Sequence, residues 1–229
     1  MATLVIAHRG ASAEKPENTL AAFRRALALK VDGIELDVQV TADGVPVVFH
    51  DSSLRRLTGQ SGRLSKQTWR ELKKLQVAGT EPIPRLSDVL TLVRGRALVQ
   101  IELKRGVPVS RVVRIIRRAR AERWVILASF EANLVREAGK LAPAIPRMLI
   151  SEGRGEAKQL LRQMADADAG GLSLHHKAVR NRAMVQAIQA GGATLWCWPV
   201  NDAAIARRLA GWGTDALLGD NPALLRRMV

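Results

Sequence analysis

Short apolar segments alternate with amphipathic ones along almost the whole chain, and this alternation constrains the fold more than any other feature. Eight segments are apolar on both faces, which is typical of buried parallel strands: residues 4–8, 33–38, 97–102, 124–130, 145–150, 171–175, 193–198 and 216–219. Helical patterns follow them at residues 18–29, 86–93, 110–122, 131–141, 156–165, 181–190, 202–210 and 222–228. Eight strand–helix pairs predict an α/β fold, a TIM (β/α)₈ barrel. A doubly wound open sheet is the alternative.

Residues 39–85 interrupt this alternation after the second strand. They contain a strand-like piece at 45–50, a polar stretch with Gly59 and Gly62, and a helical pattern at 68–75. We interpret them as a small insertion at one end of the barrel. A chain of 229 residues suffices for one barrel with such an insertion, so we expect a single domain over residues 1–229.

The chain is strongly basic, with 36 Lys and Arg against 21 Asp and Glu, a net charge of +15. Such a charge suits a nucleic-acid partner or an anionic membrane surface. In segment 110–122, however, five arginines lie outside the apolar stripe: Arg111, Arg114, Arg117, Arg118 and Arg120. We therefore expect most of the excess charge to coat the outer helices. Aromatic residues make up only 3% of the chain, which argues against a surface that stacks nucleic-acid bases.

Cysteine content and hydropathy bear on the cellular compartment in which the protein works. Cys197 is the only cysteine, which excludes an internal disulfide and any site built from several cysteines. No apolar stretch is long enough to span a membrane. The first aliphatic run has no basic region ahead of it and does not resemble a secretory signal. We expect a cytoplasmic protein.

Three carboxylates are expected to meet where strands end. In a TIM barrel the working end is formed by the C-terminal ends of the strands. Glu35 and Asp37 are two residues apart on the second strand, so both side chains lie on one side of it, and Glu102 ends the next barrel strand. Three carboxylates in a water-poor space repel one another unless a cation lies among them. Because all the ligand atoms are oxygens, we expect Mg²⁺ or Ca²⁺.

Basic and imidazole side chains are predicted at the same end. His8 and Arg9 end the first strand, Lys104 follows Glu102, and the insertion contributes His50. Arginine and lysine beside a metal suit a phosphate anion. Two imidazoles are suited to proton transfer near neutral pH. Together these groups indicate metal-assisted cleavage of a phosphodiester.

With these motifs in order, the sequence resembles the glycerophosphodiester phosphodiesterase family, a TIM-barrel family related to phosphatidylinositol-specific phospholipase C. The matching motifs span essentially the whole chain: His8-Arg9-Gly10, Pro16-Glu17-Asn18-Thr19, Glu35-Leu36-Asp37-Val38, His50-Asp51, Glu102-Leu103-Lys104, Ser129-Phe130, Trp198-Pro199-Val200-Asn201, Gly213-Thr214-Asp215 and Asp220-Asn221-Pro222. Two positions depart from the family pattern: Pro199 replaces a threonine, and Gly219 stands where the family has threonine before Asp220.

The resemblance implies a role for each matching residue. His8 and His50 correspond to an acid/base pair, and Trp198 to an aromatic wall beside the glycerol or the leaving group. Glu17 and Asn18 correspond to supports of the loop that carries His8. The family's metal ligands fall on Glu35, Asp37 and Glu102, and its phosphate contacts on Arg9 and Lys104.

The implied reaction is metal-dependent hydrolysis of small glycerophosphodiesters to glycerol 3-phosphate and an alcohol. Lysophospholipase D action on lysophospholipids, with peripheral contact to an anionic membrane, is the alternative with the same chemistry. A basic nucleic-acid-binding protein is a more remote alternative. It explains the net charge but not three carboxylates at the strand ends, so we expect no nucleic-acid partner.

Overall fold

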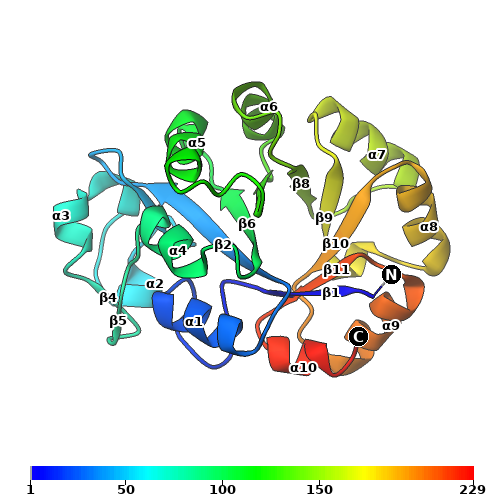
Figure 1. Cartoon of the computed structure of the whole chain (residues 1–229), viewed down its shortest axis with the longest axis horizontal. Coiled ribbons are helices and arrows are strands. Elements are labelled where there is room, and N and C mark those ends of the chain that lie inside the picture. The colour runs from blue at the N-terminus through cyan, green and yellow to red at the C-terminus, as the bar shows by residue number, and fades with distance from the viewer. Residues whose placement is uncertain (1) are drawn as a thin grey trace.

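The structure is a computed structural model that describes residues 2–229. Eight parallel strands close into a barrel, with helices around its outside (Figure 1). The strands are β1 (Leu4–Ala7), β2 (Gly33–Val40), β6 (Leu98–Leu103), β7 (Val125–Ser129), β8 (Arg147–Ser151), β9 (Gly171–His175), β10 (Thr194–Trp198) and β11 (Ala216–Gly219). Strand β1 pairs with both β2 and β11, so the first and last barrel strands are hydrogen-bonded and the sheet closes on itself. The TIM barrel prediction is confirmed and the open sheet is wrong.

The outer helices begin and end close to the predicted positions. They are α1 (Leu20–Ala28), α4 (Leu86–Val93), α5 (Val109–Arg118), α6 (Ala132–Leu141), α7 (Ala157–Asp166), α8 (Arg182–Ala190), α9 (Ala203–Trp212) and α10 (Pro222–Arg226). Side chains that accept hydrogen bonds from N–H groups of the first turn fix several of these starts, among them Thr19, Asn181 and Asp202. Helix α5 ends at Arg118, earlier than predicted, and buries Val113 instead of Ala119. Its arginines are exposed, as expected for an outer coat.

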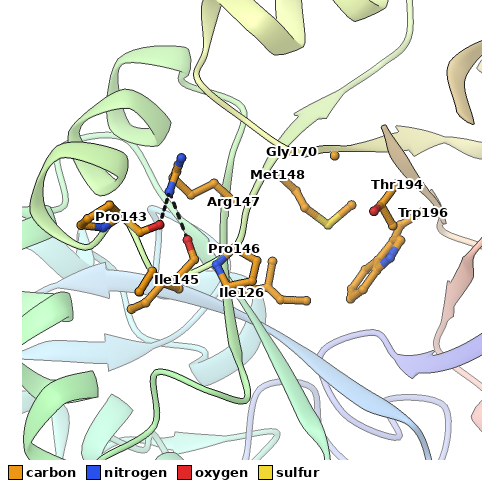
Figure 2. A pocket seen from close by; sticks show the side chains of 11 residues that line it. Ile126, Pro143, Ile145, Pro146, Arg147, Met148, Gly170, Thr194 and Trp196 are labelled. Atoms are coloured by element: carbon orange, nitrogen blue, oxygen red, sulfur yellow. Dashed lines mark hydrogen bonds between the residues drawn. The ribbon is translucent and has the colours of Figure 1, made fainter. Parts of the chain in front are cut away.

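Apolar side chains fill the space on both sides of the strands. One set lies between strands and helices, where Cys197 is buried, and another lies inside the barrel: Ile6, Ala128, Met148, Ile150, Trp196, Ala216 and Leu218. At the N-terminal ends of β7 to β10 this interior opens into a hollow of about 360 Å³ (Figure 2). Arg147 crosses its edge and donates hydrogen bonds to the carbonyls of Pro143 and Ile145. The hollow contains none of the predicted site residues.

The insertion after β2 is confirmed and has an apolar cluster of its own. Its elements are β3 (Pro46–Val48), α2 (Arg55–Thr58), the 3₁₀ turn η1 (Leu64–Lys66), α3 (Trp69–Leu72), β4 (Gln76–Val77) and β5 (Glu81–Pro82). Strand β3 runs antiparallel to the end of β2. Phe49, Leu54 and Leu64 are among the side chains that pack together beneath these short elements. The insertion thereby carries His50 to the C-terminal ends of the barrel strands.

None of the helices formed by residues 2–229 is long and apolar enough to cross a lipid bilayer. That residues 1–229 form one domain stays a prediction.

Candidate active site

A tight turn after β1 positions His8 and Arg9. The backbone is left-handed at Arg9 (φ 56°) and at Gly10 (φ 82°). Position 10 needs glycine, because a Cβ there would lie 2.7 Å from the Cβ of Ala22. The turn directs the Arg9 N–H to the Oε2 atom of Glu35, at 2.9 Å, and leaves the His8 Nε2 atom 3.9 Å from the same oxygen.

The three predicted carboxylates converge. Glu35 and Asp37 lie on β2, and Glu102 is the register partner of Asp37 on β6. Oxygens of all three lie within 4.8 Å of one another, and all three side chains are buried. Burial and the charge of Asp37 raise the pKa of Glu35 to about 8 and also raise the pKa of Glu102. A set of carboxylate oxygens this close is suited to a hard divalent cation.

Lys104 and Arg9 lie against these carboxylates. The Lys104 ammonium is 2.8 Å from Asp37 Oδ1 and also bonds Glu102, and the Arg9 Nε atom is 3.4 Å from Asp37 Oδ2. Burial disfavours charge on Asp37, but the charges of Lys104 and Arg9 outweigh it and hold the pKa of Asp37 below its usual range. Arg9 Nε is buried and donates no hydrogen bond to another described residue.

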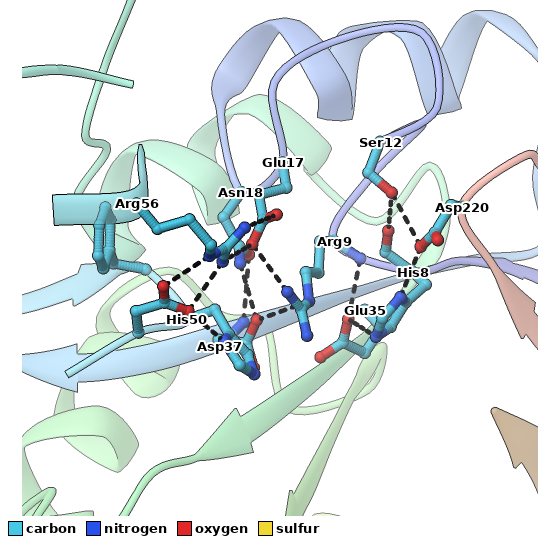
Figure 3. Close-up of polar contacts among 12 residues, drawn as sticks. His8, Arg9, Ser12, Glu17, Asn18, Glu35, Asp37, His50, Arg56 and Asp220 are labelled. Carbon is cyan, nitrogen blue, oxygen red and sulfur yellow. Dashed lines mark hydrogen bonds and ion pairs between the residues drawn. The ribbon is translucent and has the colours of Figure 1, made fainter. Parts of the chain in front are cut away.

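Each predicted catalytic histidine is hydrogen-bonded to an aspartate. His8 Nδ1 is 2.7 Å from Asp220 Oδ1 (Figure 3). His50 Nδ1 is 2.7 Å from Asp51 Oδ1. Burial lowers the pKa of His50, with help from the charge of Lys104. Burial also disfavours the charged form of His8, but Asp220 and Glu35 outweigh it and raise its pKa. The pKa values of the two imidazoles therefore move in opposite directions, a difference that suits one proton donor and one proton acceptor.

Arg56 is a residue of this site that the sequence did not single out. From α2 it donates hydrogen bonds of 2.8 and 2.9 Å to the two carboxylate oxygens of Glu17 and of 2.6 and 2.8 Å to those of Asp51 (Figure 3). Glu17 in turn accepts a 2.8 Å hydrogen bond from Arg9. Arg56 thus joins the loop that carries His50 to the loop that carries Arg9.

Two further amides hold the site in place. Asn18 was expected to support the loop after β1, and its amide donates to Asp37 Oδ2 at 2.7 Å. Gln39 was not predicted, although it continues the alternation of Glu35 and Asp37 along β2. Its Nε2 atom lies 2.7–3.0 Å from the carbonyl oxygens of residues 49–51. The alternation itself was a signal that could have identified Gln39.

The predicted residues surround one cavity of about 220 Å³ at the C-terminal ends of the strands. The predicted catalytic, metal and substrate residues all line it except Asp37, which is buried beside Lys104, whereas the predicted supports Glu17 and Asn18 lie outside it. Trp198 closes another side, with its indole N–H donating to the Ser173 carbonyl at 2.9 Å. The cavity therefore brings the acidic cluster, both histidines and the predicted aromatic wall to one place.

Close backbone packing explains why Gly219 stands where the family pattern has threonine. A Cβ at this position would collide with the Val200 carbonyl oxygen, so the backbones of β11 and the loop after β10 approach too closely for threonine. The change leaves Asp220 in place as the partner of His8.

Comparisons with known proteins agree with this geometry. The family model described as "Glycerophosphoryl diester phosphodiesterase family" matches residues 8–224. A protein of Caldanaerobacter subterraneus named glycerophosphodiester phosphodiesterase is 34% identical over 100% of this chain and 98% of its own length. The structure of an Oleispira antarctica phosphodiesterase in complex with the product sn-glycerol-3-phosphate is 28% identical, covers 99% of this chain and 96% of its own, and has a TM-score of 0.91. The glycerophosphodiester phosphodiesterase of Thermotoga maritima is 25% identical over the full length of both chains, with a TM-score of 0.86. The chain belongs to the glycerophosphoryl diester phosphodiesterase family.

Proposed function

We propose that this chain is a phosphoric diester hydrolase that converts glycerophosphodiesters into glycerol 3-phosphate and an alcohol. The observation that carries the proposal is that three clustered carboxylates and two histidines, each hydrogen-bonded to an aspartate, meet around one cavity. Family membership and the product found in the Oleispira antarctica relative support this choice of substrate.

Glu35, Asp37 and Glu102 would hold a divalent cation, Mg²⁺ or Ca²⁺. The donor set fits, because the three carboxylates offer oxygens only and their mutual repulsion favours a bound cation. When bound, the cation supplies positive charge that polarises the phosphoryl group and lowers the pKa of a hydroxyl or water.

The chain's own side chains bind the phosphate and move protons. Arg9 and Lys104 contact phosphoryl oxygens and stabilise the charge that builds up on them. An oxygen of water, or of a neighbouring substrate hydroxyl, forms a bond to phosphorus as the bond to the alcohol oxygen breaks. Where the substrate hydroxyl attacks, the product is a cyclic phosphate, and a water then adds to phosphorus and opens the ring to give glycerol 3-phosphate. One of His8 and His50 accepts the attacking group's proton, and the other donates a proton to the departing oxygen. Trp198 lies against the glycerol or the leaving alcohol.

A substrate panel tests the proposal. Glycerophosphodiesters and lysophospholipids are incubated with Mg²⁺, Ca²⁺ or Mn²⁺. The released alcohol is measured for both substrate classes, together with glycerol 3-phosphate from the diesters and acylated glycerol 3-phosphate from the lysophospholipids. We expect turnover of the deacylated diesters, loss of turnover with EDTA and its return when metal is added back. His8→Ala and His50→Ala should each lower kcat by about 10²-fold or more. Turnover that survives complete chelation would contradict the metal role.

The same panel separates the two alternatives. Lysophospholipase D action predicts turnover of acylated substrates only, together with co-sedimentation on anionic vesicles, which the exposed arginines of α5 would favour. A nucleic-acid-binding role predicts salt-dependent binding of DNA without any diester turnover.

A further inference from the structure

The cavity has two unlike halves. The strands β1, β2 and β6, with the insertion, supply its catalytic and phosphate-binding groups. The other half is formed by residues that lie in or directly after β7 to β10: Phe130, Ile150, Glu152, Ser173 and Trp198. Glu152 is the one charged side chain among these five. A phosphodiester bound at Arg9 and Lys104 therefore extends one of its two alcohols over a surface that is aromatic and carries a single negative charge.

The aromatic part of this half is fixed and open to solvent. Phe130 is 43% exposed, an unusual state for a large apolar side chain in this protein. Its ring meets that of Trp198 edge to face, with centroids 5.6 Å apart and planes at 87°. The His175 ring makes a second edge-to-face contact with Trp198, with centroids 5.2 Å apart and planes at 84°. With its N–H bonded to Ser173, the indole is locked in this orientation, and the aromatic surface exists before any substrate arrives.

Glu152 completes this half with an exposed carboxylate. It follows the end of β8, is exposed, and forms no ion pair with any residue from 2 to 229. Glu152 lines both the site cavity and a wider outer hollow of about 790 Å³ next to it. An acceptor group in this place is suited to a positive charge that enters beside the aromatic rings.

We propose that Phe130, Trp198 and Glu152 form a subsite for a positively charged alcohol, an ammonium or quaternary ammonium head group of the diester. The proposal rests on the proposed function and specifies its substrate class. Aromatic faces attract such cations through their quadrupole, and a nearby carboxylate adds a Coulomb attraction. Arg9 and Lys104 on one side and Glu152 on the other match a zwitterion whose phosphate is negative and whose alcohol is positive.

The competing occupant is an anionic head group. Arg154, Lys177 and Arg180 line the outer hollow beyond Glu152, although not the site cavity itself. Arg180 is already paired with Glu156 at 2.8 Å. A short alcohol on a phosphate held in the cavity meets the aromatic rings and Glu152 first, so we favour the cation.

The test compares substrates that differ in the charge of the alcohol. We measure kcat/KM for glycerophosphocholine and for glycerophosphoglycerol, and take their ratio. Glu152→Gln should lower this ratio about threefold through KM, and Phe130→Leu should lower it similarly, because leucine keeps the apolar bulk but not the π face. The matched control is Glu137→Gln, which makes the same charge change at an exposed position on α6 and should leave the ratio unchanged.

Binding of phosphocholine, followed by calorimetry, provides a readout that does not depend on turnover. We expect the wild type to bind it about threefold more tightly than Glu152→Gln. Equal phosphocholine binding and an equal substrate ratio in the wild type and Glu152→Gln would overturn the subsite. It would also be overturned if the wild type prefers a diester whose alcohol carries a phosphate and Arg154→Gln removes that preference. A wild type without diester turnover would contradict the proposed function, whereas the calorimetric comparison would still decide the subsite.

Discussion

His8 and Asp220, which lie 212 positions apart in the sequence, are joined by a hydrogen bond of 2.7 Å. Barrel closure brings them together. Ala7, the last residue of β1, is the register partner of Gly219, the last residue of β11, so the residues that follow both strands are neighbours. Asn201 also bonds Asp220, which fixes the carboxylate that holds the imidazole. Closing the barrel thus assembles part of the candidate active site.

Asp220→Asn should lower activity and shift its pH dependence. Asp220 raises the pKa of His8, so removing its charge lowers this pKa and reduces the protonated fraction at any given pH. We expect kcat to fall about tenfold or more and the limb of the pH–kcat/KM profile that reports His8 to move to lower pH. Asp166→Asn, an exposed position at the end of α7, is the control. A profile like that of the wild type would show that Asp220 does not act on His8.

Metal binding should be linked to proton release. The pKa of Glu35 is about 8 in the protein without metal, so a cation that binds this carboxylate displaces a proton below that pH. We therefore expect the affinity for Ca²⁺ or Mn²⁺ to weaken as the pH falls below about 8. Calorimetry in two buffers with different ionisation enthalpies counts the protons released. Glu35→Gln should weaken binding by about 10- to 100-fold. Affinity that does not depend on pH would contradict the linkage.

The barrel and the acidic cluster could be predicted because both follow from strand periodicity. Residues two apart on a strand share a side, which gave Glu35 and Asp37. The C-terminal ends of parallel barrel strands meet, which added Glu102. The same rule could have identified Asp220, since the last strand of a closed barrel lies beside the first. Its partnership with His8 was not predicted.

The insertion could not be predicted in detail. Helix α2 has four residues, too few for a helical period to be visible in the sequence. The helical pattern at 68–75 predicted α3, which is shorter and covers only Trp69–Leu72. Arg56 lies in α2, and its contact with Glu17 joins residues 39 positions apart, which no local pattern in the sequence connects. The sequence also placed Arg9 and Lys104 at the site without indicating that both pair with Asp37.

Gly10→Ala should destabilise the fold more than alanine at a comparable turn glycine. Both Gly10 and Gly59 have a positive φ, at 82° and 72°. A Cβ at Gly59 meets no atom within 4 Å, whereas at Gly10 it meets the Ala22 side chain and backbone below 3 Å. We expect a loss of about 1 kcal/mol in the free energy of unfolding for Gly59→Ala, from the backbone alone, and about 2 kcal/mol more for Gly10→Ala. Urea unfolding measures both, and equal losses would mean that the contact with Ala22 relaxes.

Arg56→Lys should impair catalysis far more than stability. The guanidinium contacts both carboxylate oxygens of Glu17 and of Asp51, a geometry that a single ammonium group cannot reproduce. The Arg56 side chain is 49% exposed, so the loss in the free energy of unfolding should stay below about 1 kcal/mol. We expect kcat to fall about tenfold, because His50 depends on Asp51 for its orientation.

Arg55→Lys is the matched control for this change. Arg55 is the adjacent residue, is exposed, and its side chain forms no ion pair with any residue from 2 to 229. Its kcat should equal that of the wild type. Added guanidinium should restore part of the activity of Arg56→Ala, which a general loss of structure would not allow. Equal kcat values for Arg56→Lys and Arg55→Lys, or no rescue of Arg56→Ala, would show that the link between the two loops does not position His50.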